Sequence, residues 1–236
     1  MSTEENQDTP AGNDGLMDQL LDAALLHVVF DGWSKASFDA AIADADVNPV
    51  LAQALCPRGA LDLAVAYHQR GDQAMLARLA ASDLSGLRFR DKIAALVRYR
   101  LDAAEDKDAV RRGVTLFALP NHAAEGAKLV WGTCDAIWTA LGDTSDDLNW
   151  YSKRTILSGV YSSTLLYWLG DDSPDHQATW EFLDRRIDNV MQFEKVKADL
   201  NKNPLLKPFL AGPAWLSAQI RRPAPRDDLP GQSRGS

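Results

Sequence analysis

Apolar residues recur three and four positions apart along most of this chain of 236 residues. The spacing is clearest in residues 16–30, 93–101, 129–141 and 182–190. Nowhere do four to eight consecutive residues alternate strictly between apolar and polar, as they would in a half-buried strand. The pattern therefore predicts an all-α fold of about nine or ten helices.

Prolines and glycines mark where these helices begin and end. The pairs Asn48-Pro49 and Ser173-Pro174 are typical of an N-cap followed by proline at the first helical position. Gly71 and Gly170 follow periodic runs, and we expect each to end a helix. Asp143 or Ser145 is expected to cap a helix that runs to Leu169, with Asp146 and Asp147 in its first turn.

Composition divides the chain into five expected segments. Both ends are polar and contain Pro and Gly, which favours disorder. The segments are a disordered tail (1–14), a helix-turn-helix-like lobe (15–70), a larger helical lobe (71–200), an amphipathic segment (203–222) and a second disordered tail (223–236).

The first lobe has the helix spacing of a helix-turn-helix. Its apolar skeleton resembles that of the TetR-type DNA-binding domain at Phe38, Ile42, Ala43, Ala45, Val47, Leu51 and Leu55. Between Gly15 and Ala60, however, Lys35 and Arg58 face six aspartates, and residues 49–56 carry no charge. Duplex binding needs cations for the phosphates. We therefore expect no nucleic-acid binding, and a ligand-responsive TetR-type repressor is kept as the alternative function.

Residues 126–190 contain the most specific sequence of the chain. The run "GDTSDDLNWYSKR" (142–154) is followed by "DDSPDHQATWEFLDRRID", and "LRFRDKIAALVRYRL" precedes both at 87–101. Together they resemble the coenzyme Q (ubiquinone) biosynthesis accessory family, whose members are lipid-binding proteins with a TetR-like fold, and the resemblance extends over about residues 16–222. The resemblance implies a non-enzymatic protein that binds isoprenoid lipids, including ubiquinone intermediates, and helps the demethoxyubiquinone hydroxylase obtain its substrate.

 It also implies a homodimer.

One face of the helix that ends at Leu169 is broadly apolar. We expect its residues to line a site for a lipid tail, or else to form ordinary core. The candidate lipid-binding residues are Leu157, Val160, Tyr161, Thr164 and Trp168 on this face, together with Trp138 in the periodic run before it. No other cofactor is expected.

The start of the same helix carries two neighbouring aromatic residues. Trp150 and Tyr151 have polar neighbours, which predicts that they are exposed as anchors for a partner protein. With Leu148 they match the position of the hydroxylase-facing patch of the family that the chain resembles. The other interpretation is that they only close the helix onto its neighbour.

Motifs for catalysis and metal binding are missing from the sequence. The four histidines are isolated, and no phosphate loop or nucleophile elbow occurs. The acids of "DDSPDH" (171–176) could ligate a cation, but a helix start explains them more simply. Cys56 and Cys134 lack a partner motif and are expected to be buried, reduced thiols rather than a disulfide. We therefore expect no metal site and no enzymatic activity.

The segment 203–222, "NPLLKPFLAGPAWLSAQIRR", is apolar with a basic edge. Residues 195–222 hold six basic side chains against one acid, in a chain whose net charge is −8. This favours attachment to an anionic membrane surface. The expected contact residues are Leu205, Leu206, Phe209, Leu210, Trp215, Leu216, Ile220, Arg221 and Arg222.

Two alternatives remain open for this segment. Pro208 and Pro213 make a kinked element as reasonable as a single helix. The segment could also pack on the acidic body of its own or a second copy. The first fourteen residues contain four acids and no Lys or Arg, which argues against a secretory or mitochondrial signal. We expect a cytoplasmic protein at the inner face of a bacterial inner membrane.

Overall fold

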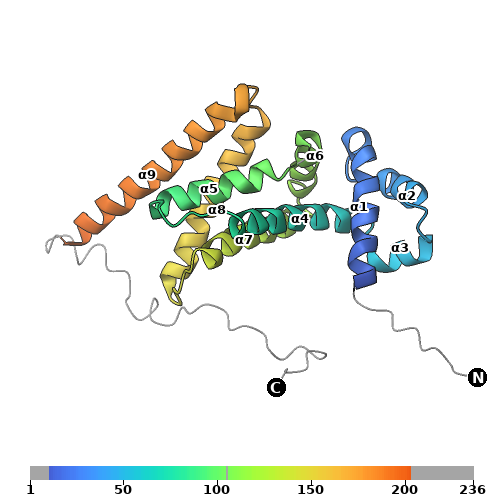
Figure 1. The fold of residues 1–236 in the computed structure, drawn as a ribbon, viewed down its shortest axis with the longest axis horizontal. Helices are drawn as coiled ribbons and strands as arrows, with labels where there is room; N and C mark the ends of the chain where they lie inside the picture. Colours follow the sequence, from blue (N-terminus) through green and yellow to red (C-terminus); the bar gives the residue numbers. More distant parts are fainter. Residues whose placement is uncertain (1–10, 105, 203–236) are drawn as a thin grey trace, which may run out of the picture.

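The computed structural model describes residues 11–104 and 106–202, and these residues form only helices and turns. The predicted all-α fold is confirmed (Figure 1). The helices are α1 (Ala11–Asp31), α2 (Lys35–Asp44), α3 (Pro49–Leu55), α4 (Ala60–Ala80), α5 (Phe89–Asp102), α6 (Lys107–Phe117), α7 (Ala123–Ala140), α8 (Leu148–Leu169) and α9 (Gln177–Lys202), with a 3-10 turn (Pro174–His176) before the last.

The first lobe is built around α1. Figure 1 shows α2 and α3 on one side of α1 and the longer helices on its other side. Leu20, Val28 and Phe38 are buried in this core together with Leu63 from the first half of α4. Burial of these side chains supplies the main favourable free energy of the lobe, because each removes a large apolar surface from water.

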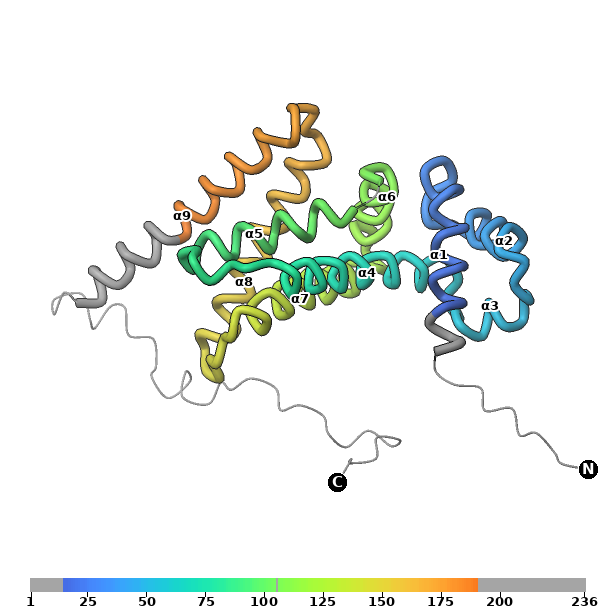
Figure 2. The backbone as a smooth tube through the Cα atoms, viewed as in Figure 1, coloured from blue at the N-terminus to red at the C-terminus, as the bar shows by residue number. Residues whose placement is uncertain are grey.

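In the second lobe, α5 and α7 pack against α4, α8 packs against α7, and α9 packs against α8 and α5. Its core includes Met75 of α4, Leu96 of α5, Ile137 of α7, Leu157 of α8 and Leu183 of α9. The tube in Figure 2 can be followed from the first lobe into the second along α4, which contributes to both cores. The two lobes therefore share one continuous helix.

The boundary predicted at residues 70 and 71 falls inside α4, between Leu63, which belongs to the first core, and Met75, which belongs to the second. Gly71 does not end a helix but lies buried in this one. The absence of a side chain at Gly71 leaves room for a neighbour, because a Cβ atom there would lie 2.4 Å from Nη1 of Arg100 on α5. The glycine is a site of close helix approach, which sequence reasoning mistook for a cap.

Other predicted helix ends were partly correct. Asn48 caps α3 with Pro49 at its first position, and Gly170 follows the last residue of α8, as predicted. The cap of α8 is Asp147, whose side chain accepts from the backbone N–H of Asn149, and neither Asp143 nor Ser145. Helix α1 begins at Ala11, inside the stretch predicted to be a disordered tail.

Both cysteines are buried and free, which confirms the prediction of reduced thiols. Burial raises the pKa of the Cys56 and Cys134 thiols to about 11. Within the described part of the chain, no helix is both long enough and apolar enough to span a bilayer. The predicted membrane-contacting residues, Leu205 to Arg222, lie outside the described residues.

Candidate functional site

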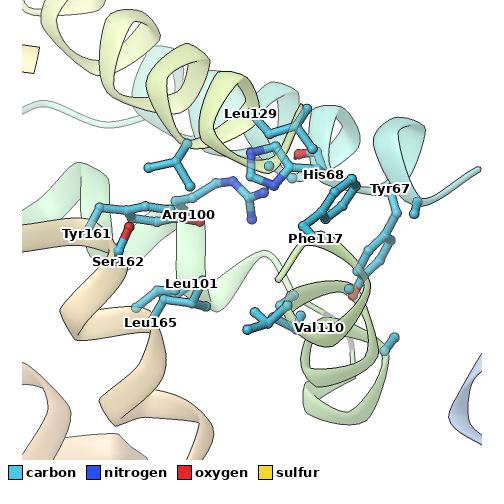
Figure 3. Close-up of a pocket in the computed structure, with 18 of the residues that line it drawn as sticks. Tyr67, His68, Arg100, Leu101, Val110, Phe117, Leu129, Tyr161, Ser162 and Leu165 are labelled. Carbon is cyan, nitrogen blue, oxygen red and sulfur yellow. Dashed lines mark hydrogen bonds between the residues drawn. The ribbon is translucent and has the colours of Figure 1, made fainter. Parts of the chain in front are cut away.

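A cavity of about 330 Å³ lies between helices α4, α5, α6, α7 and α8. Figure 3 shows side chains from these helices facing the same space. Most of the wall is apolar, and it includes Leu101, Val110, Val114, Phe117, Leu129, Val130 and Leu165. The volume is at the lower end of the range for small-molecule sites, and an apolar wall with few polar groups is typical of them.

One part of the wall is polar and centres on Arg100. This side chain is only 7% exposed, and its Nε donates to Oδ1 of Asp72 at 2.6 Å. Its Nη2 donates to the backbone carbonyl of His68 at 2.9 Å. The hydroxyl of Thr133 also donates to Asp72, at 2.8 Å. The buried guanidinium is therefore paired with a carboxylate, as a buried charge must be.

His68 lies beside this pair and is neutral at pH 7. Burial, followed by the nearby positive charge of Arg100, lowers the pKa of His68 to about 4. Its Nε2 lies 2.9 Å from Oγ1 of Thr133 on α7. This part of the wall thus places a paired guanidinium beside an uncharged imidazole.

Of the six predicted lipid-binding residues, Tyr161 and Trp168 line the cavity. Leu157, Val160 and Thr164 are buried in the second lobe but do not line it. These three belong to the part of the wide α8 face that packs against neighbouring helices. Trp138 does not line the cavity either: its ring packs on Phe89 at 5.5 Å, and its indole donates to the carbonyl of Lys153.

Sequence reasoning missed the polar wall. Arg100 lines the cavity, whereas Asp72 and Thr133, which complete its hydrogen-bond network, do not. The three residues come from three helices, and no local motif links them. One signal was present, because Arg100 follows Leu96 by four residues on the apolar face of α5. A charged residue on such a face is buried only with a partner, which makes it a marker of an internal site.

The predicted partner-binding residues form the edge of an aromatic cluster at the start of α8. Trp150 and Tyr151 are half-buried, because each packs on Trp131 of α7, with ring centroids 5.7 and 6.3 Å apart. The two rings are therefore less exposed than predicted, and their role as partner anchors stays a prediction. Leu148, in contrast, is 45% exposed.

A buried ion-pair network holds this aromatic cluster in place. The guanidinium of Arg154 lies 4.1 Å from the ring centroid of Trp150 and donates to its backbone carbonyl. Arg154 also donates to the carboxylates of Asp143, at 3.0 Å, and Asp135, at 2.5 Å. Burial alone would raise the pKa of Asp143, but hydrogen bonds from Lys153, Ser145 and Arg154 hold it well below the usual range. The charged residues of the "GDTSDDLNWYSKR" run therefore orient its aromatic residues.

The acids of "DDSPDH" act mainly in the turn before α9. Asp171 accepts hydrogen bonds from the hydroxyl and the backbone N–H of Thr179, at 2.5 and 2.9 Å. These hydrogen bonds, that of the Thr179 hydroxyl first, lower the pKa of Asp171. Among the described residues, no three His, Cys, Asp or Glu side chains are grouped as metal ligands would be. The geometry agrees with the helix-start interpretation of this motif.

Comparison with known proteins links the site to one family. Residues 123–194, which include α7, α8 and the start of α9, match the COQ9 family model. The chain is 28% identical over 193 residues to the probable mitochondrial ubiquinone biosynthesis protein coq9 of Dictyostelium discoideum, covering 78% of this chain and 62% of that protein. It is 30% identical over 186 residues to the mitochondrial COQ9 protein of Drosophila melanogaster, covering 77% and 57%. The chain thus spans about three fifths of the length of these relatives.

The fold also resembles that of a TetR transcriptional regulator from Nitrosomonas europaea, with a TM-score of 0.62. The likeness covers 76% of this chain and 99% of that one, at 20% sequence identity, and it concerns the fold alone. Both the predicted family resemblance and the predicted fold are confirmed. The chain is similar to COQ9 proteins over about three quarters of its length, and it has a TetR-like fold.

Proposed function

We propose that this protein is a non-enzymatic accessory factor of ubiquinone biosynthesis that binds a prenylated quinone intermediate and presents it to the demethoxyubiquinone hydroxylase. The observation that carries the proposal is the apolar-walled cavity of about 330 Å³, which lies partly within the segment that matches the COQ9 family. Two relatives of this chain are described as ubiquinone biosynthesis proteins. A lipid intermediate is the ligand class that suits both observations.

The dimensions of the cavity limit how much of the lipid it encloses. At about 330 Å³, it accommodates an aromatic ring and the first part of a prenyl tail. The rest of a long tail would extend out of the cavity toward the bilayer. Binding therefore removes the reactive ring from the membrane while the tail stays partly in apolar surroundings, which lowers the free-energy cost of extraction.

The exposed edge of the aromatic cluster is the proposed docking surface for the hydroxylase. Leu148 presents an accessible apolar side chain. Trp150 and Tyr151 both pack on Trp131, and Trp150 also contacts Arg154. Aromatic residues held in place lose little entropy on binding, which makes them effective anchors at protein interfaces.

The segment 203–222 is the proposed membrane anchor. Its leucines and Trp215, with Arg221 and Arg222, have the composition of an interfacial element that binds anionic lipid. We propose that it places the cavity near the inner face of a bacterial inner membrane. The protein is proposed to act as a homodimer.

No structural observation favours a transcription repressor. Helix α3, which would enter the DNA groove, carries no charged residue and exposes Val50 and Leu51. Such a surface neither neutralises phosphates nor reads base edges.

Mass spectrometry of lipid extracted from the purified, detergent-free protein tests the proposal. The expected result is a polyprenyl phenol or quinone above the level found in a mock purification. A protein that carries no such lipid, and also takes up none when incubated with vesicles that contain ubiquinone, would overturn it.

A further inference from the structure

The polar wall of the cavity holds hydrogen-bond donors that the protein does not use. Nε and Nη2 of Arg100 are bonded to Asp72 and His68, whereas Nη1 donates to none of the described residues. Figure 3 shows the guanidinium reaching toward the space bordered by Phe117, Val110 and Leu101. A donor on a side chain that is 93% buried has a strong requirement for an acceptor, because the desolvated N–H group is costly when unpaired.

Tyr161 adds a second donor to the same wall. Its side chain is 1% exposed and lines the cavity next to Arg100. Burial raises the pKa of the Tyr161 phenol, so the hydroxyl keeps its proton near neutral pH. The wall therefore offers donors and suits a ligand oxygen that accepts hydrogen bonds.

The two guanidinium groups on the cavity wall are both paired with carboxylates. The charge of Arg100 is balanced by Asp72 at 2.6 Å. The other cation on the wall, Arg70, is bonded to Asp22 at 2.6 Å and Asp18 at 2.9 Å. Both guanidinium groups on the described wall are therefore already paired with carboxylates, so a phosphate entering the cavity would meet no unbalanced positive charge there.

We infer that the cavity selects an amphiphile whose buried end is an uncharged ring with an accepting oxygen, such as a quinone carbonyl, over one that ends in a phosphate. The inference rests on the proposed function, since it assumes that the cavity binds a lipid. It adds that Arg100 and Tyr161 supply the donors and that Asp72 sets the preference for a neutral ligand.

Calorimetric titration of the full chain with two probes of equal tail length tests the inference. The probes are a decyl-substituted benzoquinone and decyl phosphate, each used below its micelle concentration. We expect the quinone to bind at least tenfold more tightly, because a buried hydrogen bond to a charged donor is worth about 1.5–3 kcal/mol.

Replacing Asp72 isolates the cause of the preference. Asp72→Asn leaves the charge of Arg100 unbalanced, and we expect the ratio of quinone to phosphate affinity to fall at least tenfold. The matched control is Asp102→Asn, which removes a carboxylate paired with Arg78 at 2.9 Å and away from the cavity wall. The control should keep the ratio of the unmodified protein. Should Asp72→Asn fail to fold, Tyr161→Phe is expected to weaken quinone binding at least threefold and to leave phosphate binding unchanged.

The outcomes separate the two proposals. Equal affinity for both probes, a preference for phosphate, or a ratio that is insensitive to Asp72→Asn would overturn the selection of neutral ligands and leave lipid binding intact. Saturable binding of neither probe would overturn the proposed function, and the inference with it.

Discussion

The guanidinium of Arg100 crosses α4 at Gly71, so closely that a Cβ atom on Gly71 would lie 2.4 Å from Nη1. Gly71→Ala must therefore displace the Arg100 side chain, which is buried and paired with Asp72. We expect a loss of about 1–3 kcal/mol in the free energy of unfolding, measured by urea denaturation. Gly159→Ala on α8 is the control, because its Cβ atom would meet nothing within 4 Å. The control should gain up to about 1 kcal/mol, and equal effects at both positions would contradict the close approach.

The ion pair of Asp143 with Arg154 predicts a loss of stability in acid. The pKa of Asp143 is lowered in the folded protein, so its contribution is fully present above the unfolded value of about 3.9 and is lost as the pH falls through the lower folded value. Urea denaturation between pH 2 and pH 7 measures how the free energy of unfolding falls in acid. Asp143→Asn should make this fall shallower, and it should lower the free energy of unfolding by about 3 kcal/mol at neutral pH, since Arg154 stays buried without its partner. The exposed Asp146 in the same loop serves as the control, and Asp146→Asn should leave the acid dependence of the free energy of unfolding unchanged.

His68 predicts a separate pH dependence at higher pH. Its pKa is lowered from 6.5 to about 4 in the folded protein, so the unfolded chain takes up a proton first as the pH falls. Stability is therefore full above about pH 6.5 and declines toward pH 4, by up to about 3 kcal/mol. His68→Gln should remove this slope from urea titrations between pH 4 and pH 7. His122→Gln, at the start of α7, should keep it; a slope that persists without His68 would refute the assignment.

The proposed docking surface predicts a loss of affinity without a loss of stability. Leu148 is 45% exposed, so Leu148→Ala should leave the melting temperature within about 2 °C and weaken hydroxylase binding at least tenfold. Trp150→Ala should weaken binding further but also destabilise α8, because its ring contacts Arg154 and Trp131. Leu119→Ala, at a similarly exposed leucine elsewhere, is the control for surface plasmon resonance. Unchanged affinity in Leu148→Ala and Trp150→Ala would remove this surface from the proposal.

The terminal segment predicts membrane binding that depends on lipid charge. A chain truncated after Asn203 should no longer float with vesicles that contain anionic phospholipid, because it lacks the apolar residues and Arg221 and Arg222. The full chain should float with anionic vesicles and less with neutral ones. Circular dichroism of the truncated chain checks that the helices remain. Flotation of the truncated chain to the same extent would assign membrane binding to another part of the molecule.

Periodicity and turn residues were enough to predict the helical class and several helix ends. The apolar spacing of α5 and α7 and the pair Asn48-Pro49 depend on contacts within a few residues, which the local sequence contains. The family resemblance was also evident from sequence, because the runs that carry it, 142–154 and the one beginning at Asp171, lie within the residues that match the family model. The cap of α8 was misplaced by up to four residues, since three nearby acids are equally good caps by composition.

The tertiary structure alone decided what the charged residues do. Asp72 and Arg100 are 28 residues apart, and only the packing of α4 against α5 makes them a buried pair beside a cavity. The same packing turned Gly71 from an expected helix end into a contact point. The packing of α7 against α8 brought Trp131 to Trp150. By itself the sequence determined which segments are helical and which faces are apolar, because these follow from local spacing. The cavity and its polar wall depend on contacts between distant helices, and such contacts leave no periodic trace along the chain.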